Sequence, residues 1–313
     1  MRTADHLASF ARFIARREER ERADTAALED LAKTPLPLPS GLSIEWLGTA
    51  GYRVTFEGHT LLIDPYLTRV PLSATFRRTP ALADPALHEQ LLARDIGQVD
   101  GILVGHTHFD HAIDVPILTQ RLATRAYGSD SLVRLMGLYG LGERAVEVVP
   151  REAYELGPFV VRFIPSLHSK LLLGYKVPFD GALSCEHLDA LSPAQYKCGA
   201  VYAIQIKAGG TCVYHQGSAN LIDEEVPAEG ADIFLAGIAG RSFTDRYWDR
   251  VLRLLRPEVV VANHFDDFFR PLSAPMGFST NVNLAALPDE IRAVSRDIAV
   301  AALAPMTGSV ASA

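Results

Sequence analysis

The residues best able to do chemistry lie between positions 106 and 111. The run reads His106, Thr107, His108, Phe109, Asp110, His111, so three imidazoles and a carboxylate fall close together. Histidines packed this densely repel one another when protonated and cannot all find buried acceptors, and a bound metal ion removes both problems. Alternate side chains of an extended segment point the same way, so His106 and His108 can bind one ion. Asp110 and His111 follow a bend and can reach a second ion. The spacing therefore predicts a metal site rather than a polar surface loop.

The neighbouring pattern puts this run between a strand and a helix. The apolar residues 101–104 predict a strand, and residues 115–122, with Pro116 suited to a first turn, predict a helix. Upstream, short β-type runs separated by glycine turns predict an antiparallel meander at residues 43–47, 52–56 and 60–63. The histidines are therefore expected on a strand-to-helix loop.

The rest of the chain continues this mixture of strands and helices. Further strands are predicted at residues 159–164, 201–206, 211–214, 233–235 and 259–262, with a helix at 247–255. Such a mixture is typical of α/β layers. Residues 4–31 carry apolar positions at helical intervals among many charges, and alternating prolines stiffen the stretch that follows. We therefore expect a helical extension with a proline-rich linker over residues 1–40, and one main domain over residues 41–313.

Composition limits the class of protein. The chain has 313 residues, of which 48% are apolar, so it can bury a large core and is not a disordered or fibrous protein. Its formal charge is −7, and its one dense charged run, Arg16 to Arg22, alternates in sign like a solvated helix face, so no nucleic-acid partner is expected. No stretch reaches the roughly 18 apolar residues of a membrane span, and we expect a soluble, cytoplasmic protein. Three cysteines are too few for a disulfide framework or a cysteine zinc site, although a pair between Cys185 and Cys198 stays open.

The motif at 106–111 matches the His-x-His-x-Asp-His signature of the metallo-β-lactamase superfamily, which the chain resembles from about Gly41 to Phe269. This resemblance implies a four-layer αββα sandwich. It implies a first ion bound by His106, His108 and His168, and a second ion bound by Asp110, His111 and His264. It also implies that Asp64, at the end of the strand at 60–63, orients the ligands from behind. The alternatives are a turn-forming role for Asp64 and a buried structural role for His168.

One position departs from the family pattern. The superfamily usually presents a Gly-Asp pair whose carboxylate bridges the two ions, whereas this chain reads Gly217-Ser218, so Ser218 stands at the bridging position. A neutral hydroxyl is a much weaker ligand for a hard dication than a carboxylate. The second ion is therefore expected to bind loosely, to bind water in place of the carboxylate, or to be absent.

The resemblance also implies the chemistry. It points to hydrolysis by metal-activated water, with Asp110 orienting the nucleophile, on an ester, lactone or phosphodiester bond. The expected cofactor is Zn²⁺, as one or two ions, with Mn²⁺ and iron as alternatives. The opening meander is loosely similar to the branch that includes ascorbate-phosphate lactonases and acyl-ethanolamine phospholipases. A catalytically degenerate metal-binding scaffold and a diiron redox protein are the competing interpretations.

The remaining expectations concern the substrate and the surroundings of the site. Residues 170–179 directly follow His168 and are rich in apolar side chains, so they form either a lid over the site or a buried strand with a turn. If they form a lid, the small-molecule substrate has an apolar portion. An assembly of identical subunits stays open. Asp266 and Asp267 follow His264, and their expected use is a helix cap or a surface turn.

Overall fold

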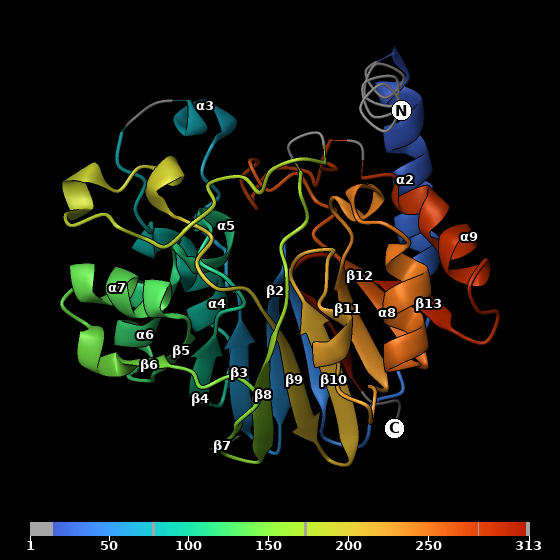
Figure 1. Ribbon diagram of the computed structural model, residues 1–313, viewed down its shortest axis with the longest axis horizontal. Coiled ribbons are helices and arrows are strands. Elements are labelled where there is room, and N and C mark those ends of the chain that lie inside the picture. Colours follow the sequence, from blue (N-terminus) through green and yellow to red (C-terminus); the bar gives the residue numbers. More distant parts are fainter. Residues whose placement is uncertain (1–14, 77–78, 172–173, 281, 311–313) are drawn as a thin grey trace.

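The computed structural model describes residues 15–76, 79–171, 174–280 and 282–310. Within this part of the chain, two β-sheets pack face to face and helices cover both outer faces (Figure 1). The four-layer αββα sandwich expected from the sequence is therefore confirmed. Every strand predicted above is present, and so is the antiparallel meander that opens the domain.

The first sheet is antiparallel on one side and parallel on the other. Its order, from edge to edge, is β14 (Thr307–Val310), β1 (Ser43–Gly48), β2 (Gly51–Phe56), β3 (His59–Ile63), β4 (Gln98–Leu103), β5 (Ala126–Gly128) and β6 (Ala145–Glu147). Pairing is antiparallel from β14 to β3 and parallel from β3 to β6. The change occurs at β3, which is also the strand that leads into Asp64.

The second sheet repeats this pattern. Its order is β7 (Ala153–Leu156), β8 (Phe159–Pro165), β9 (Tyr202–Ala208), β10 (Thr211–Gln216), β11 (Ile233–Gly237), β12 (Val259–Asn263) and β13 (Ala299–Ala302). Pairing is antiparallel from β7 to β10 and parallel from β10 to β13. The strands β3 and β10 thus occupy equivalent positions in two similar halves, although the sequence shows no repeat by eye.

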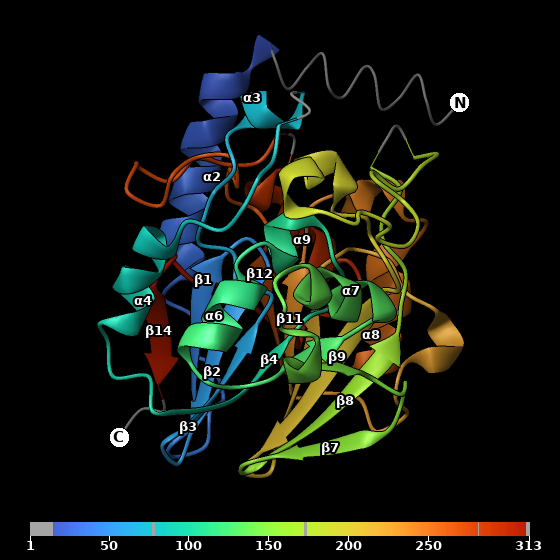
Figure 2. The same ribbon diagram turned by 90° about the vertical axis from the view of Figure 1, so that its left-hand side faces the viewer.

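The helices divide between the two outer faces. They are α2 (Arg17–Leu31), α3 (Leu72–Thr75), α4 (Glu89–Leu92), α5 (Phe109–Ala112), α6 (Val115–Arg121), α7 (Asp130–Leu138), α8 (Tyr247–Leu255) and α9 (Leu287–Arg292). Figure 2 shows α6 and α7 in front of the first sheet, and Figure 1 shows α8, α9 and α2 on the side of the second sheet. No helix in the described ranges is long and apolar enough to cross a membrane.

Both faces of the inner strands are buried, which explains their continuous apolar runs. In β3, Leu61 and Ile63 point into the core between the sheets, while Leu62 points into the core beneath the helices. The same alternation separates Leu103 from Ile102 in β4. Because side chains on both faces are packed in a core, the ends of these strands have fixed positions, and so do the starts of the loops that follow them.

The N-terminal helix is attached to the domain by a buried carboxylate. Residues 15–31 include the single described helix α2, and the first half of the predicted helical region lies outside the described residues. Asp24 on α2 is buried and accepts a hydrogen bond of 2.9 Å from the backbone N–H of Ala285, in the 3₁₀ turn Leu284–Ala286. Burial raises the pKa of Asp24.

We expect Asp24→Ala to destabilise the protein by about 0.5–1.5 kcal/mol, because it leaves the half-buried N–H of Ala285 without its acceptor. Asp24→Asn retains an acceptor oxygen at the same place and should cost much less. Urea unfolding of the two variants, monitored by circular dichroism, measures the difference. Equal stability of Asp24→Ala and the wild type would show that this contact does not hold α2.

Candidate metal centre

The residues of the 106–111 motif leave β4 as an extended segment and then enter a short helix. His106 and His108 precede α5, and His108 has extended backbone angles (φ −59°, ψ 153°). Asp110 and His111 lie within α5, so the helical turn carries their side chains away from the first two histidines. The predicted strand-to-helix loop is present, with the helix beginning inside the motif at Phe109.

In the described part of the chain, ligand-type side chains gather into two buried groups. The first set consists of His106, His108 and His168, and the second set consists of Asp110, His111 and His264. In each set the potential ligand atoms lie within 4.8 Å of one another. The two sets adjoin, because the ring centroids of His106 and His111 are 3.8 Å apart. The grouping is the one that the sequence predicted.

Hydrogen bonds to the outer nitrogens orient the imidazoles of the first set. Nε2 of His108 lies 2.8 Å from the carbonyl oxygen of Pro178, and Nδ1 of His168 lies 2.7 Å from that of Ser169. A carbonyl can only accept, so each of these nitrogens carries the proton and the other nitrogen of the ring presents its lone pair. Both inner lone pairs face the centre of the set.

The donor set fits a metal ion. Nε2 of His106 lies 3.1 Å from Nδ1 of His108, which is close to the separation of roughly 3.3 Å that two nitrogens have on one tetrahedral zinc with bonds of about 2.0–2.1 Å. Three imidazole nitrogens at such spacing match the ligands that zinc and related transition metals prefer. The first set therefore has the chemistry of a metal site.

Asp64 contacts the second set through the outer nitrogen of His111. One of its carboxylate oxygens lies 2.8 Å from Nδ1 of His111, and the other accepts a 2.7 Å hydrogen bond from the backbone N–H of Gly105. Its turn-forming alternative also holds in part, because Asp64 has a left-handed backbone (φ 40°). Within the set, Nε2 of His264 lies 3.3 Å from Oδ2 of Asp110.

The two sets differ in charge. Burial, and then the neighbouring imidazoles, lower the pKa of His106 well below its usual range, and burial lowers the pKa of His108 to about 4 and of His168 to about 3. For Asp110 burial opposes ionisation, but His111 and His264 outweigh it and lower the pKa below the usual range. For His111 burial is outweighed by Asp64 and Asp110, which raise the pKa. At neutral pH the first set is uncharged and the second carries a carboxylate.

This difference predicts stepwise loss of metal as the pH falls. Protons and metal ions compete for the same imidazole lone pairs. A histidine with a raised pKa is protonated at a higher pH, so it loses its metal ion at a higher pH. The raised pKa of His111 should release an ion from the second set first, while the first set retains its ion until the pH approaches about 4, the pKa of His108. Zinc content after dialysis at a series of pH values measures both steps, and release of both ions in one step would contradict the assignment of charges.

Ser218 follows the end of β10 by two residues and contacts the segment that follows His168. Its buried hydroxyl accepts a 3.0 Å hydrogen bond from the backbone N–H of Ser169, and the two hydroxyl oxygens are 3.2 Å apart. A Cβ on the preceding Gly217 would lie 2.9 Å from Cε1 of His111 and 3.1 Å from Asp64, so this segment contacts the second set directly. Sequence reasoning identified Ser218 but missed its partner, Ser169.

Within residues 170–171 and 174–179, the described part of the segment after His168, there is no strand longer than a single bridge residue, so the expected buried strand is not seen there. Its described residues form loops and turns, Tyr175 is exposed, and the carbonyl of Pro178 holds His108. Phe179 lies edge-on to His108, with ring centroids 6.3 Å apart. On the opposite side, Phe268 lies edge-on to His264 at 5.3 Å. Aromatic side chains therefore flank both sets.

Of the two acidic residues that follow His264, Asp266 differs from its prediction and Asp267 agrees with it. Asp266 is neither a helix cap nor part of a surface turn: it is buried, pairs with Arg69 at 2.8 Å and accepts a hydrogen bond from the N–H of Thr49. Asp267 does stand in a turn, where it accepts from the N–H of Phe269. Arg69 was missed, because nothing in the sequence relates it to a residue near position 266.

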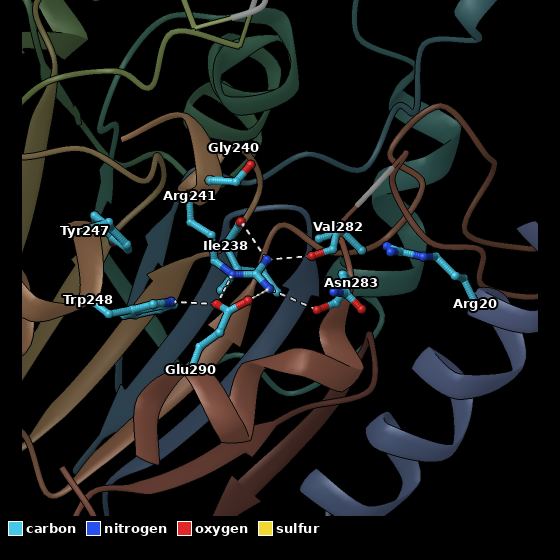
Figure 3. Close-up of a pocket in the computed structure, with 10 residues that line it drawn as sticks. Arg20, Ile238, Gly240, Arg241, Tyr247, Trp248, Val282, Asn283 and Glu290 are labelled. Atoms are coloured by element: carbon cyan, nitrogen blue, oxygen red, sulfur yellow. Dashed lines mark hydrogen bonds and ion pairs between the residues drawn. The ribbon is translucent and has the colours of Figure 1, made fainter. Parts of the chain in front are cut away.

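A cavity of about 250 Å³ lies beside the turn that follows β11, and its lining includes none of the ligand-type residues above. Figure 3 shows Arg241 at its centre, paired with Glu290 and with the carbonyls of Ile238, Val282 and Asn283. The indole N–H of Trp248 donates to the same carboxylate at 2.9 Å. The hydrogen bonds among these groups attach the turn to α9. We therefore assign the polar side chains beside the cavity a structural role.

Comparison with known proteins gives consistent matches. A family model described as the beta-lactamase superfamily domain matches residues 43–264. A UPF0173 metal-dependent hydrolase of Polynucleobacter asymbioticus is 28% identical over 231 residues, covering 71% of this chain and 73% of the relative. One of Anaeromyxobacter sp. is 28% identical over 266 residues, covering 80% and 79%. The solved structure of Igni18, a metallo hydrolase of Ignicoccus hospitalis, has a TM-score of 0.55 at 18% identity and covers 85% of this chain and 97% of that one, which shows a common fold.

Proposed function

This chain belongs to the metallo-β-lactamase superfamily of metal-dependent hydrolases, and from that membership we propose that it hydrolyses an ester, lactone or phosphodiester bond of a small molecule. We propose Zn²⁺ as the cofactor, with Mn²⁺ and iron as alternatives, bound as one or two ions. The ligands are His106, His108 and His168 for the first ion, and Asp110, His111 and His264 for the second. The observation that carries this proposal is the pair of adjoining buried sets, in which His108, His111 and His168 are already held through their outer nitrogens.

The residues of the site have different roles in the proposed reaction. The metal ions, when bound, polarise the bond under attack and supply a nucleophile at neutral pH. Asp110 is a carboxylate at neutral pH, because nearby imidazoles lower its pKa, and it can accept a hydrogen bond from the attacking water and so orient it. Asp64 holds His111 in one tautomer, and the carbonyls of Pro178 and Ser169 do the same for His108 and His168.

The surroundings favour a substrate with an apolar portion. Phe179 and Phe268 lie within ring contact of the two sets, and Phe268 packs against Phe269 and Phe109. Leu167, next to His168, is exposed. Apolar and aromatic groups beside a few polar ones are typical of small-molecule sites. An acyl or aromatic group next to the scissile bond would bury these side chains.

A direct test combines metal analysis with a substrate panel. We expect the purified full-length protein to contain zinc, to turn over members of a panel of esters, lactones and phosphodiesters, and to lose this activity in EDTA and regain it with added Zn²⁺. Bound metal without turnover on any of these bonds would favour a catalytically degenerate scaffold, which the serine at position 218 keeps as the second candidate. A coloured, iron-containing protein would favour redox chemistry instead.

A further inference from the structure

His264 differs from His108, His111 and His168 in the way it is held. His108, His111 and His168 are each fixed through an outer ring nitrogen. Nδ1 of His264 is buried and, among the described residues, has no hydrogen-bond partner. On its outer side, this imidazole is therefore positioned by its backbone and by the loop that carries it, not by a hydrogen bond to the ring.

That loop is tied to the rest of the site by two neighbouring contacts. The backbone of His264 is left-handed (φ 57°), and its N–H donates to the carbonyl of Thr49 at 2.7 Å. Two residues later, Asp266 accepts from the N–H of Thr49 at 2.9 Å with one carboxylate oxygen and pairs with Nη1 of Arg69 at 2.8 Å with the other. Asp266 thus joins the loop after β12 to the β1–β2 turn and to Arg69.

Arg69 is built into the fold at this point. It is 4% exposed and, within the described residues, its Nε and Nη2 have no partner, so Asp266 is the carboxylate that compensates its buried charge. Its guanidinium lies over the ring of Tyr66, 5.1 Å from the centroid. A Cβ at Gly48 would stand 1.9 Å from Nη2 of Arg69, so only glycine leaves room for this side chain.

The loop that carries Arg69 also fixes the other half of the second set. It begins at Asp64, which holds His111, and the N–H groups of Leu67 and Thr68 donate to Asp114 at 2.7 and 2.9 Å. Asp114 follows His111 by three residues. The loop from Asp64 to Arg69 therefore braces the helix α5 at one end and the loop of His264 at the other.

We propose that Arg69 is a positioning residue for the second metal set, acting through its buried ion pair with Asp266. This inference rests on the proposed metal centre. A charge pair removed from water is held tightly, because separation would leave either charge without compensation. The pair therefore helps to keep His264 next to Asp110 and His111 from the outer side of the ring, where Nδ1 has no partner among the described residues. Arg69 itself is no ligand, and it acts on the first set only through the shared scaffold.

The test measures stepwise Zn²⁺ binding to the metal-free, full-length protein by calorimetry. Asp266→Asn preserves an acceptor for Thr49 and removes the ion pair, and the double variant Arg69→Met with Asp266→Asn removes both charges, so that no buried charge is left uncompensated if the single variant folds poorly. Removal of a group that orients a metal ligand typically weakens metal binding about 10- to 100-fold. We expect this decrease in affinity in the second binding step alone. Glu290→Gln, which removes the carboxylate from the Arg241 pair of Figure 3, is the matched control and should change neither step.

Two results would overturn the role of Arg69. One is a second step that stays unchanged in a folded double variant, and the other is equal weakening of both steps, which would indicate general loosening of the fold. A wild-type protein that binds no zinc would instead contradict the proposed metal centre, so failure of the function and failure of the positioning role are distinguishable.

Discussion

Replacing His106 by Ala is expected to remove most of the bound metal and to lower hydrolysis by at least about a thousandfold. The ring of His106 contacts those of both His108 and His168 in the first set and that of His111 in the second. Metal ions contribute several kcal/mol to hydrolytic transition states, and about 4 kcal/mol corresponds to about a thousandfold in rate. The variant should still fold, because apolar burial holds the layers together and the site lies beyond the ends of the strands.

Zinc analysis, circular dichroism and rate measurements on the same preparation separate these effects. His187→Ala is a suitable control, because His187 is exposed and belongs to neither set. It should match the wild type in metal content and rate. A folded His106→Ala protein with full activity would show that the centre lies elsewhere.

The second large effect concerns the missing carboxylate. Ser218→Asp should tighten the second step of zinc binding by at least about tenfold, because a negative charge between two dications offsets their repulsion. In the absence of metal the introduced carboxylate joins the buried Asp64 and Asp110, so the metal-free variant should unfold at a lower temperature than the wild type and recover on addition of zinc.

Ser218→Asn controls for size without charge and should produce neither change. Calorimetry gives the binding steps, and thermal unfolding with and without zinc gives the stability. The rate need not rise, since the substrate can use the space or the hydroxyl that Ser218 provides. Indistinguishable affinities of the two ions in both the wild type and the variant would mean that another residue supplies the missing ligand.

The parts of the fold that could be predicted are those with a local signal. The strands of the meander and β4, β8 and β12 have apolar runs with turn residues at their ends, and the histidine motif carries its own spacing. The short strands β5, β6, β7 and β13 were missed, because three or four residues are too few to establish an alternation. So was β14, whose partner β1 is remote in the sequence.

In the candidate site, too, the residues with a local sequence signal could be predicted and the others could not. The ligand-type residues could be named from the motif and from histidines that follow strands, because the end of a strand fixes a direction. Ser169, Arg69 and the burial of Asp266 could not, since they depend on loops that meet only in the folded chain. Gly48 was a weak signal in retrospect: it is a turn glycine whose missing side chain leaves room for a charged group from another loop.

The position of β14 bears on how the protein is made. Ser43 in β1 pairs with Val310 in β14, so the edge of the first sheet is formed by segments from opposite ends of the chain. During synthesis the outer edge of β1 stays unpaired until residues 307–310 have left the ribosome. An unpaired strand edge invites pairing with another chain, and contacts between distant residues form slowly. Nascent chains stalled before β14 should therefore be the form of this protein most prone to aggregate and most dependent on chaperones.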